Sequence, residues 1–294
     1  MSVLRRLALV GLCAVPLPAA AADCGGQQDQ IEVIAEAFLA KEQVTEPGDI
    51  PDERTARCMA DALIAIIGTH AEWGAPVGYK VGLTSKGVQQ RMGINTPAWG
   101  ILTQGMLIPS GSKIPRAHAA RPLAEADLMV TIADDGIMSA TTVEEAAQHI
   151  SQLTAFIELP DLVYADGIKP TLVREIAINV GARHGVVGNS VPMTPALIAA
   201  LPHLTVNMTT LGEKRWDSEG KRLMGHPLAP LVWLVEKLKS EGRSLKAGDV
   251  VALGSFGPPL TPDFPGQDML VTYTDEKGND LPGGPLSVKV TFSP

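Results

Sequence analysis

The chain has 294 residues, and its 24 Lys and Arg against 32 Asp and Glu give a formal net charge of −8. It has no basic patch of the kind that binds a phosphate backbone, so no nucleic acid is expected as a partner. Aromatic residues make up only 4% of the chain, so aliphatic side chains must build the core. The length suits one large domain, or a core with an N-terminal cap.

The first 22 residues have the pattern of a signal peptide. Arg5 and Arg6 precede the apolar stretch 7–17, and alanines occupy positions 20–22. The stretch is too short to span a bilayer, and small residues before the cut suit signal peptidase. We therefore predict cleavage after Ala22, which gives a periplasmic or secreted protein with no membrane association.

Two cysteines, Cys24 and Cys58, follow the predicted cleavage site. In a reducing compartment they would be buried or incidental thiols. In an oxidising compartment an even pair favours a disulfide, which would join the mature N-terminus to the second predicted helix. The chain has no C-x-x-C motif and no zinc-like spacing of Cys and His, which argues against a structural zinc site.

The N-terminal part, residues 23–76, is predicted to be helical. Residues 29–42 show helical periodicity of apolar side chains, and a second helix is expected over about 53–72. Proline and glycine at 47–51 separate the two helices, and Gly74 and Pro76 end the region.

Residues 77–294 read as one β-rich core. Thr142 and Glu145 predict a capping box that begins a helix over 142–153, and another helix is expected over 228–241. A turn is expected at 217–220. The order of these elements is irregular, so the pattern indicates an α+β fold and neither a doubly wound sheet nor a TIM barrel. Strands are expected at 78–84, 99–108, 125–132, 155–159, 204–211, 250–253, 270–274 and 288–292.

The most informative feature is a group of acidic residues. Glu125 and Asp127 begin a predicted strand, where residues two apart point to the same side, and Glu158 lies in the apolar stretch 156–159. An acid at a strand start commonly faces solvent. A carboxylate within an apolar stretch, however, needs a partner. Neighbouring carboxylates repel unless a proton or cation lies between them, so the group suits Mg²⁺ or Mn²⁺.

Lys80 is a second charge inside an apolar strand. It could be a surface lysine whose stem packs on apolar neighbours. Beside a metal-bound carboxylate substrate it would instead supply positive charge and a proton. Motifs of several other enzyme classes are absent: the chain has no G-x-S-x-G elbow, Walker loop, G-x-G-x-x-G or H-E-x-x-H.

Several short motifs follow one another in an order that resembles the 2-keto-4-pentenoate hydratase and 4-oxalocrotonate decarboxylase group of the fumarylacetoacetate hydrolase superfamily. The resemblance covers roughly residues 30–292. The motifs are GYKVGLTS at 78–85, EAD at 125–127, Glu158, GHPL at 225–228, LKAGDVV at 245–251, and Gly254 with Ser255.

The resemblance implies a helical N-terminal part, a mixed β-rich core of the fumarylacetoacetate hydrolase type and a homo-oligomer. It implies a Mg²⁺ or Mn²⁺ held by Glu125, Asp127 and Glu158, where Asp127 replaces the glutamate of the family. Lys80 would be catalytic. The substrate would contact Thr84, Asn179, Ser255 and His226, although His226 could equally orient the helix that follows it.

The implied activity is that of an exported hydratase acting on a small 2-oxo acid of the 2-hydroxypenta-2,4-dienoate type. Three alternatives remain open: a decarboxylase, an acylpyruvate C–C hydrolase, and a binding protein or degenerate enzyme that keeps the pocket without turnover. They remain open because the chain departs from the family pattern at 95–100, which contains no acid, and at 178–183, where Gly181 and Ala182 replace serines.

Overall fold

The structure of the protein is a computed structural model, and it describes residues 24–294. The predicted signal peptide, residues 1–22, lies outside the described residues. The helices are α1 (Gln28–Ala40), α2 (Glu53–Ile67), α3 (Lys86–Met92), α4 (Val143–Gln148), α5 (Leu172–Ala177), α6 (Pro195–Ala200) and α7 (Ala229–Ser240). The strands are β1 (Pro76–Gly82), β2 (Ala98–Thr103), β3 (Leu107–Pro109), β4 (Lys113–Pro115), β5 (Glu125–Ile132), β6 (Ile150–Leu159), β7 (His184–Pro192), β8 (Thr205–Thr210), β9 (Glu213–Glu219), β10 (Val250–Ala252), β11 (Asp268–Thr274) and β12 (Leu286–Ser293).

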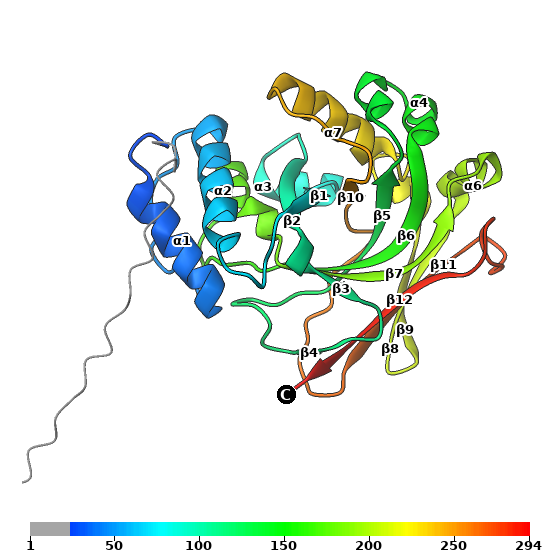
Figure 1. Ribbon diagram of the computed structural model, residues 1–294. Coiled ribbons are helices and arrows are strands. Elements are labelled where there is room, and N and C mark those ends of the chain that lie inside the picture. The colour runs from blue at the N-terminus through cyan, green and yellow to red at the C-terminus, as the bar shows by residue number, and fades with distance from the viewer. Residues whose placement is uncertain (1–23) are drawn as a thin grey trace, which may run out of the picture.

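Two mixed sheets form the core. The larger sheet has the strand order β2-β1-β10-β5-β6-β7-β3, and the smaller has the order β4-β12-β11-β8-β9. Strands β11 and β12 of the smaller sheet pack against β6 and β7 of the larger one. Figure 1 shows α4 and α7 above the larger sheet and the smaller sheet below it. The predicted α+β class is confirmed, with the central strands β5 and β6 enclosed between these layers.

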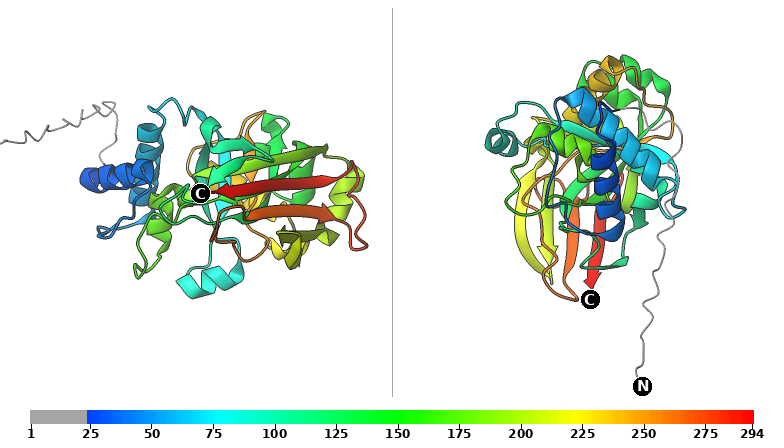
Figure 2. Two further views of the ribbon diagram at one scale, coloured as in Figure 1. Left: turned by 90° about the horizontal axis from the view of Figure 1, so that it is seen from below. Right: turned by 90° about the vertical axis from the view of Figure 1, so that its left-hand side faces the viewer.

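The N-terminal helices lie at one end of the molecule, away from β11 and β12 (Figure 2). Helix α2 begins after Asp52, whose carboxylate accepts a hydrogen bond of 2.8 Å from the backbone N–H of Thr55, as an N-cap residue does. The Cys24–Cys58 disulfide is present, with the two Cα atoms 5.5 Å apart. It joins the first described residue to α2, as expected for an oxidising compartment.

A buried ion pair ties the same end to the core. Arg183 donates to Asp161 over 2.9 Å and to the carbonyl of Phe38 over 2.7 Å. Arg183 and Asp161 are 1% and 0% exposed. Their pairing offsets what would otherwise be a large desolvation cost. The pair attaches α1, which carries Phe38, to the loop that follows β6.

Several expected boundaries differ from the structure. The helix expected over 142–153 ends after six residues, because β6 already begins at Ile150. Its capping box is confirmed: Thr142 Oγ1 accepts from the N–H of Glu145, and Glu145 accepts from the N–H of Thr142, both at 3.2 Å. The β6 segment pairs along its length with β5 and β7, and this tertiary pairing outweighs the local helical pattern.

Two further corrections concern α2 and the second sheet. Helix α2 ends at Ile67, short of the expected position 72, because Gly68 follows it. The turn expected at 217–220 is wrong, since β9 continues to Glu219 and the hairpin between β8 and β9 turns at Leu211 and Gly212. Both residues have positive φ, as the tight turn requires. Within residues 24–294, no helix is long and apolar enough to cross a membrane.

Candidate active site

The three predicted acidic residues lie on one face of the larger sheet. Glu125 and Asp127 are two apart on β5, so their side chains share a face. Glu158 of β6 is the register partner of Glu125, and directly opposite residues project to the same side. Asp127 and Glu158 are 0% and 3% exposed, whereas Glu125 is half-buried. The sequence prediction that Glu125 and Asp127 share a face is confirmed, and the β5–β6 register brings Glu158 to the same face.

Lys80 reaches this face from β1. Its register partner on β10 is Ala252, which in turn pairs with Met129 of β5, two residues beyond Asp127. The Lys80 Nζ donates a hydrogen bond to Glu158 and a second one of 2.9 Å to the carbonyl oxygen of Val180. Lys80 is only 3% exposed, so it is not a surface lysine. The buried ammonium has one carboxylate partner here.

Asp127 is held by backbone donors on one side only. Its Oδ1 accepts hydrogen bonds from the N–H groups of Leu128, Leu253 and Gly254 over 2.6, 3.1 and 2.8 Å. Its Oδ2 is buried and has no hydrogen-bond partner among the described residues. Burial raises the pKa of Asp127 well above its usual range, and the charge of Glu158 raises it further. An unpartnered buried carboxylate oxygen is costly unless a proton or a cation reaches it.

The charge of Glu158 also acts on Glu125. Its pKa is raised to about 7, mainly by burial and then by the charge of Glu158, while Lys80 acts in the opposite direction. Two of the three carboxylates therefore carry raised pKa values, and Glu158 contributes to both. A single ammonium does not compensate the whole group.

The donor set fits a hard divalent cation. All three side chains offer carboxylate oxygens, which Mg²⁺ and Mn²⁺ prefer, and Asp127 Oδ2 is free to bind. In the described part of the chain, no three His, Cys, Asp or Glu side chains are already gathered closely enough to hold a metal. Glu158 contacts Lys80 through its Oε1, and a carboxylate has a second oxygen to offer to a cation.

The backbone around the site includes several residues in the left-handed region. Leu83, Asn179 and Val180 have φ values of 56°, 55° and 54°. Non-glycine residues in this region cost roughly 1–3 kcal/mol each and concentrate at functional sites. At Val180 the conformation belongs to the short 3-10 turn η3 (Asn179–Gly181), whose Val180 carbonyl accepts from Lys80. The strained turn therefore supplies an acceptor for the buried ammonium.

Thr84 lies next to the acidic residues. It is 5% exposed, and a Cβ placed on Gly254 would come within 2.7 Å of its hydroxyl oxygen. Because the N–H of Gly254 also binds Asp127, Thr84 is close to this carboxylate. Ser255 is half-buried on the same loop, and its hydroxyl donates to the carbonyl of Gly257 over 3.0 Å.

Asn179 is close to the site but uses its amide within the fold. Its Oδ1 accepts from the N–H of Ile101 over 2.7 Å, and its Nδ2 donates to the carbonyl of Ile101 over 2.9 Å. The residue is 1% exposed. Its visible role is to fix η3 on β2, and its contact with substrate stays a prediction.

His226 lies at the beginning of α7. Its Nδ1 accepts a hydrogen bond of 3.0 Å from the N–H of Leu228, the residue before the helix. Burial lowers its pKa, and the one charged group that raises it is Glu144 on α4. This geometry matches the alternative in which His226 orients the helix. Among the described residues, His226 makes no hydrogen bond to Lys80 or to the three carboxylates.

Sequence reasoning did not single out two further titratable residues, Glu175 and Tyr164. Glu175 on α5 has its pKa raised to about 7 by burial, with the charges of Lys80 and Arg121 acting in the opposite direction. The hydroxyl of Tyr164 is buried and has no hydrogen-bond partner in the described range. Burial, and then the charge of Glu175, raises the pKa of Tyr164. A glutamate within the largely apolar segment 172–177 was the available signal.

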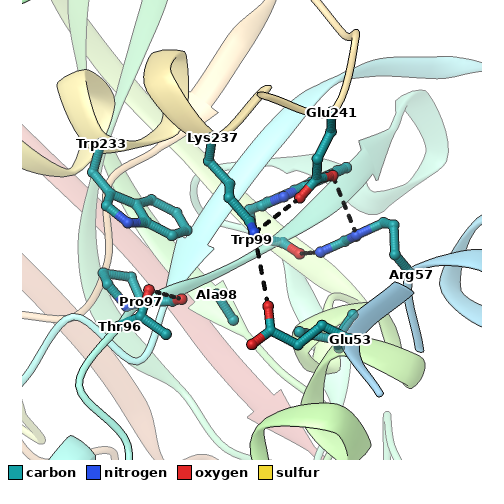
Figure 3. A pocket seen from close by; sticks show the side chains of 10 residues that line it. Glu53, Arg57, Thr96, Pro97, Ala98, Trp99, Trp233, Lys237 and Glu241 are labelled. Carbon is teal, nitrogen blue, oxygen red and sulfur yellow. Dashed lines mark hydrogen bonds and ion pairs between the residues drawn. The ribbon is translucent and has the colours of Figure 1, made fainter. Parts of the chain in front are cut away.

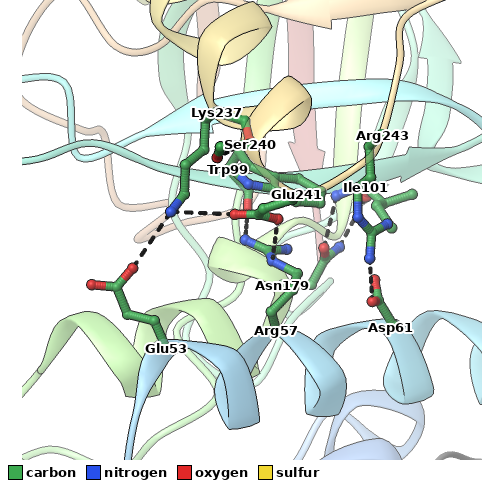
Figure 4. Close-up of polar contacts among 10 residues, drawn as sticks. All are labelled: Glu53, Arg57, Asp61, Trp99, Ile101, Asn179, Lys237, Ser240, Glu241 and Arg243. Carbon is green, nitrogen blue, oxygen red and sulfur yellow. Dashed lines mark hydrogen bonds and ion pairs between the residues drawn. The ribbon is translucent and has the colours of Figure 1, made fainter.

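A second cluster of charged residues surrounds a small pocket between α2 and α7 (Figure 3). Lys237 lies 3.7 Å from Glu53 and 3.3 Å from Glu241. Arg57 lies 3.9 Å from Glu241 and donates to the carbonyl of Trp99 over 2.7 Å (Figure 4). Its guanidinium carbon is 3.4 Å from the centre of the Trp99 ring. This α2–α7 charge cluster joins α2 to β2 and α7.

Comparisons with known proteins agree with this fold. No family model matches the chain. It is 29% identical over 184 residues to the 2-keto-4-pentenoate hydratase of Burkholderia vietnamiensis, covering 62% of this chain and 68% of that protein. It is 30% identical over 183 residues to the hydratase of the same name from Paraburkholderia xenovorans, covering 62% and 66%. The chain is a homologue of these hydratases.

A solved structure matches nearly the whole described chain. The 4-oxalocrotonate decarboxylase from Pseudomonas putida G7, complexed with calcium and acetate, superposes with a TM-score of 0.75, covering 90% of this chain and 98% of that one. The sequences are 23% identical, so the likeness establishes the fold. The resemblance inferred from the ordered motifs is confirmed, and so is the fold type. The hydratase alignments span about two thirds of the length of these relatives.

Proposed function

We propose that this chain is a metal-dependent hydratase-like enzyme that acts on a small 2-oxo acid. The observation that carries the proposal is the buried face on which Lys80 meets Glu125, Asp127 and Glu158. Its homology to the 2-keto-4-pentenoate hydratases, which are hydro-lyases, supports the reaction class. The decarboxylase of the same fold was solved with calcium and with magnesium, which supports a divalent cation.

Glu125, Asp127 and Glu158 would hold Mg²⁺ or Mn²⁺. When bound, such a cation supplies a Lewis acid for a substrate oxygen that gains negative charge. The unpartnered Asp127 Oδ2 is the ligand atom already free, and the N–H groups on Oδ1 fix the orientation of this carboxylate. Glu158 would offer the carboxylate oxygen that Lys80 does not bind.

Lys80 would then act on the substrate. Its ammonium is buried and held by Glu158 and the Val180 carbonyl, so it stays directed towards this face. There it can bind a carboxylate of the substrate or transfer a proton to carbon during ketonisation. Thr84 and Ser255 supply hydroxyls next to Asp127 for substrate orientation. In a hydratase, water adds to the conjugated double bond in the last step.

The test is an assay of the purified mature protein with Mg²⁺ or Mn²⁺ against 2-hydroxypenta-2,4-dienoate, 4-oxalocrotonate and acylpyruvates. We expect the dienoate absorbance to fall when protein and cation are both present. Addition of EDTA or the substitution Glu125→Ala should abolish this fall in absorbance. Glu236→Gln, a change at an exposed glutamate of α7, serves as the matched control and should keep full activity. Turnover that survives EDTA or Glu125→Ala would contradict the metal-dependent mechanism. Tight binding of a 2-oxo acid without turnover of any substrate would favour the binding-protein alternative.

We further propose that the protein is exported and works in an oxidising compartment. The basic and apolar pattern of residues 1–22 and the Cys24–Cys58 disulfide both support this location. Expression with the native N-terminus, followed by fractionation and N-terminal sequencing, should give a periplasmic protein that begins at Asp23. Recovery in the cytoplasm with residues 1–22 intact would contradict it. Association as a homo-oligomer stays part of the proposal, and light scattering of the mature protein tests it.

A further inference from the structure

The turn η3 has a backbone conformation that its residues do not all favour by themselves. Asn179, Val180 and Gly181 have φ values of 55°, 54° and 67°. Glycine adopts a positive φ without steric cost and asparagine tolerates it, but in a β-branched valine it is an outlier. Contacts with the rest of the fold must therefore hold this turn.

The side chain of Asn179 supplies two of these contacts. Its Oδ1 accepts a hydrogen bond of 2.7 Å from the N–H of Ile101, and its Nδ2 donates one of 2.9 Å to the carbonyl of the same residue (Figure 4). The amide thus pairs with β2 as a residue of a neighbouring antiparallel strand would. A Cβ on Gly100 would come within 2.4 Å of the Asn179 carbonyl oxygen, so a glycine is needed for this close approach. The Asn179 amide therefore clamps η3 to β2.

The clamped turn places a carbonyl group on Lys80. Val180 packs on Gly82 of β1, where a Cβ would come within 2.6 Å of Val180 Cγ1. The carbonyl oxygen of Val180 accepts the hydrogen bond of 2.9 Å from Lys80 Nζ. The next carbonyl, that of Gly181, accepts a hydrogen bond of 2.9 Å from the N–H of Asp161. The carbonyl that binds the ammonium is therefore held in place from both sides along the chain.

Two acceptors determine the rotation of the Lys80 ammonium. An ammonium has three N–H donors, which point in tetrahedral directions. One donor is bonded to Glu158 Oε1 and one to the Val180 carbonyl, and no third acceptor contacts this nitrogen among residues 24–294. Because two of the three directions are fixed, the direction of the third follows. That third N–H is the donor that Lys80 can offer to a substrate.

We propose that Asn179 is a positioning residue for Lys80: its amide holds the Val180 carbonyl in place, and this carbonyl directs the remaining N–H of the ammonium to the substrate. The inference rests on the proposed function for the role of that N–H. A misdirected donor slows the chemical step more than it weakens substrate binding. The clamp itself and its effect on the ammonium do not depend on turnover, so two separate tests are available.

The first test is steady-state kinetics of Asn179→Gly, which removes the amide but keeps a residue that accepts positive φ. The variant should lower kcat roughly 10–100-fold and change KM less than about threefold. If Asn179→Gly does not fold, Gly82→Ala takes its place, since the added Cβ pushes Val180 away from the Lys80 face. Full kcat in the folded variant, or a rise in KM alone, overturns the inference.

The matched control is Asn189→Gly. Asn189 is an exposed residue of β7 whose amide also holds two backbone groups, the carbonyl of Pro285 and the N–H of Ser287. The control therefore loses the same kind of clamp without a change next to Lys80, and it should keep kcat. An equal loss of kcat in both glycine variants overturns the inference, because the effect would then follow from any loss of such a clamp.

The second test observes the Lys80 ammonium directly, by NMR of metal-free protein with isotope-labelled lysine. A buried ammonium with two acceptors exchanges its protons slowly with water, so Lys80 should give a signal that Lys80→Met lacks. Asn189→Gly should keep this signal, and Asn179→Gly should lose it to exchange. A missing wild-type signal, or an unchanged signal in Asn179→Gly, overturns the inference. If the wild type turns over no substrate but the signals behave as expected, the proposed function fails while the positioning of Lys80 by Asn179 stands.

Discussion

The protein has two clusters of charge, and they differ in how their charges are balanced. In the α2–α7 charge cluster, Arg57 and Lys237 both lie beside Glu241, and Lys237 also lies beside Glu53 (Figure 4). On the site face three carboxylates share a single ammonium, which among them is bonded to Glu158 alone, and burial and the charge of Glu158 raise the pKa of Glu125 and Asp127. The first arrangement stabilises the attachment of α2. The second leaves carboxylate repulsion that a proton or a cation would relieve, and such perturbed pKa values are typical of functional sites.

Asp127→Asn should have the largest effect and should act on function and stability in opposite directions. Asparagine keeps an oxygen for the three backbone donors but replaces the free Oδ2. Metal affinity should fall roughly 10–100-fold, and turnover should fall with it. The metal-free protein should unfold at higher urea concentration, because a repelling buried charge is gone. Isothermal titration with Mn²⁺ and urea unfolding measure the two effects, and a fall in both would contradict the comparison.

Loss of the disulfide should be the largest purely structural effect. Cys24 and Cys58 are separated by 34 positions in the sequence. Replacing both cysteines with serine should therefore lower the free energy of unfolding by about 3–4 kcal/mol. The bridge attaches the N-terminus to α2, far from the carboxylates, so Mn²⁺ affinity should remain within about twofold under conditions where the variant is folded. A variant as stable as the wild type would show that the bridge does not constrain α2.

Arg57→Met should break the α2–α7 charge cluster. The change leaves Glu241 without Arg57 and removes the cation–π contact with Trp99. The loss should cost about 2 kcal/mol of unfolding free energy. Arg54→Met, at an exposed position of the same helix, should have an effect within the small range that is usual for surface substitutions. Guanidinium unfolding compares the two variants, and a similar cost for both would mean that the paired cluster adds nothing to stability.

The smallest effect concerns pH. The pKa of Glu125 is raised to about 7 from an ordinary 4.5, so the folded protein takes up this proton at a higher pH than the unfolded chain. As the pH falls from about 7 towards the ordinary pKa of 4.5, protonation of Glu125 should therefore raise the free energy of unfolding of the metal-free protein by about 1 kcal/mol. Metal affinity should decrease over the same range. Urea unfolding at about pH 5.5 and about pH 7.5 measures the gain, which Glu125→Gln should remove.

Much of the fold followed from local patterns. The strand predicted at 125–132 is β5 to the residue, and the capping box at Thr142 begins α4 as expected. Errors arose where tertiary pairing overrode the local pattern. The helix after Thr142 was expected to reach 153, but pairing with β5 and β7 draws the chain into β6 from Ile150. The β8–β9 turn was misplaced because the polar segment 217–220 looked more like a turn than Leu211 and Gly212.

The sequence by itself determined that Glu125 and Asp127 share a face, because the strand period is two, and the ordered motifs determined the family resemblance. Only the tertiary structure decided how those charges are paired. The β5–β6 register brings Glu158 opposite Glu125, and Lys80 takes Glu158 as its partner. The packing of η3 on Gly82 and Gly100 brings the Val180 carbonyl to the same lysine. Such contacts join residues far apart in the sequence, and their energy depends on burial, which no local pattern of residues encodes.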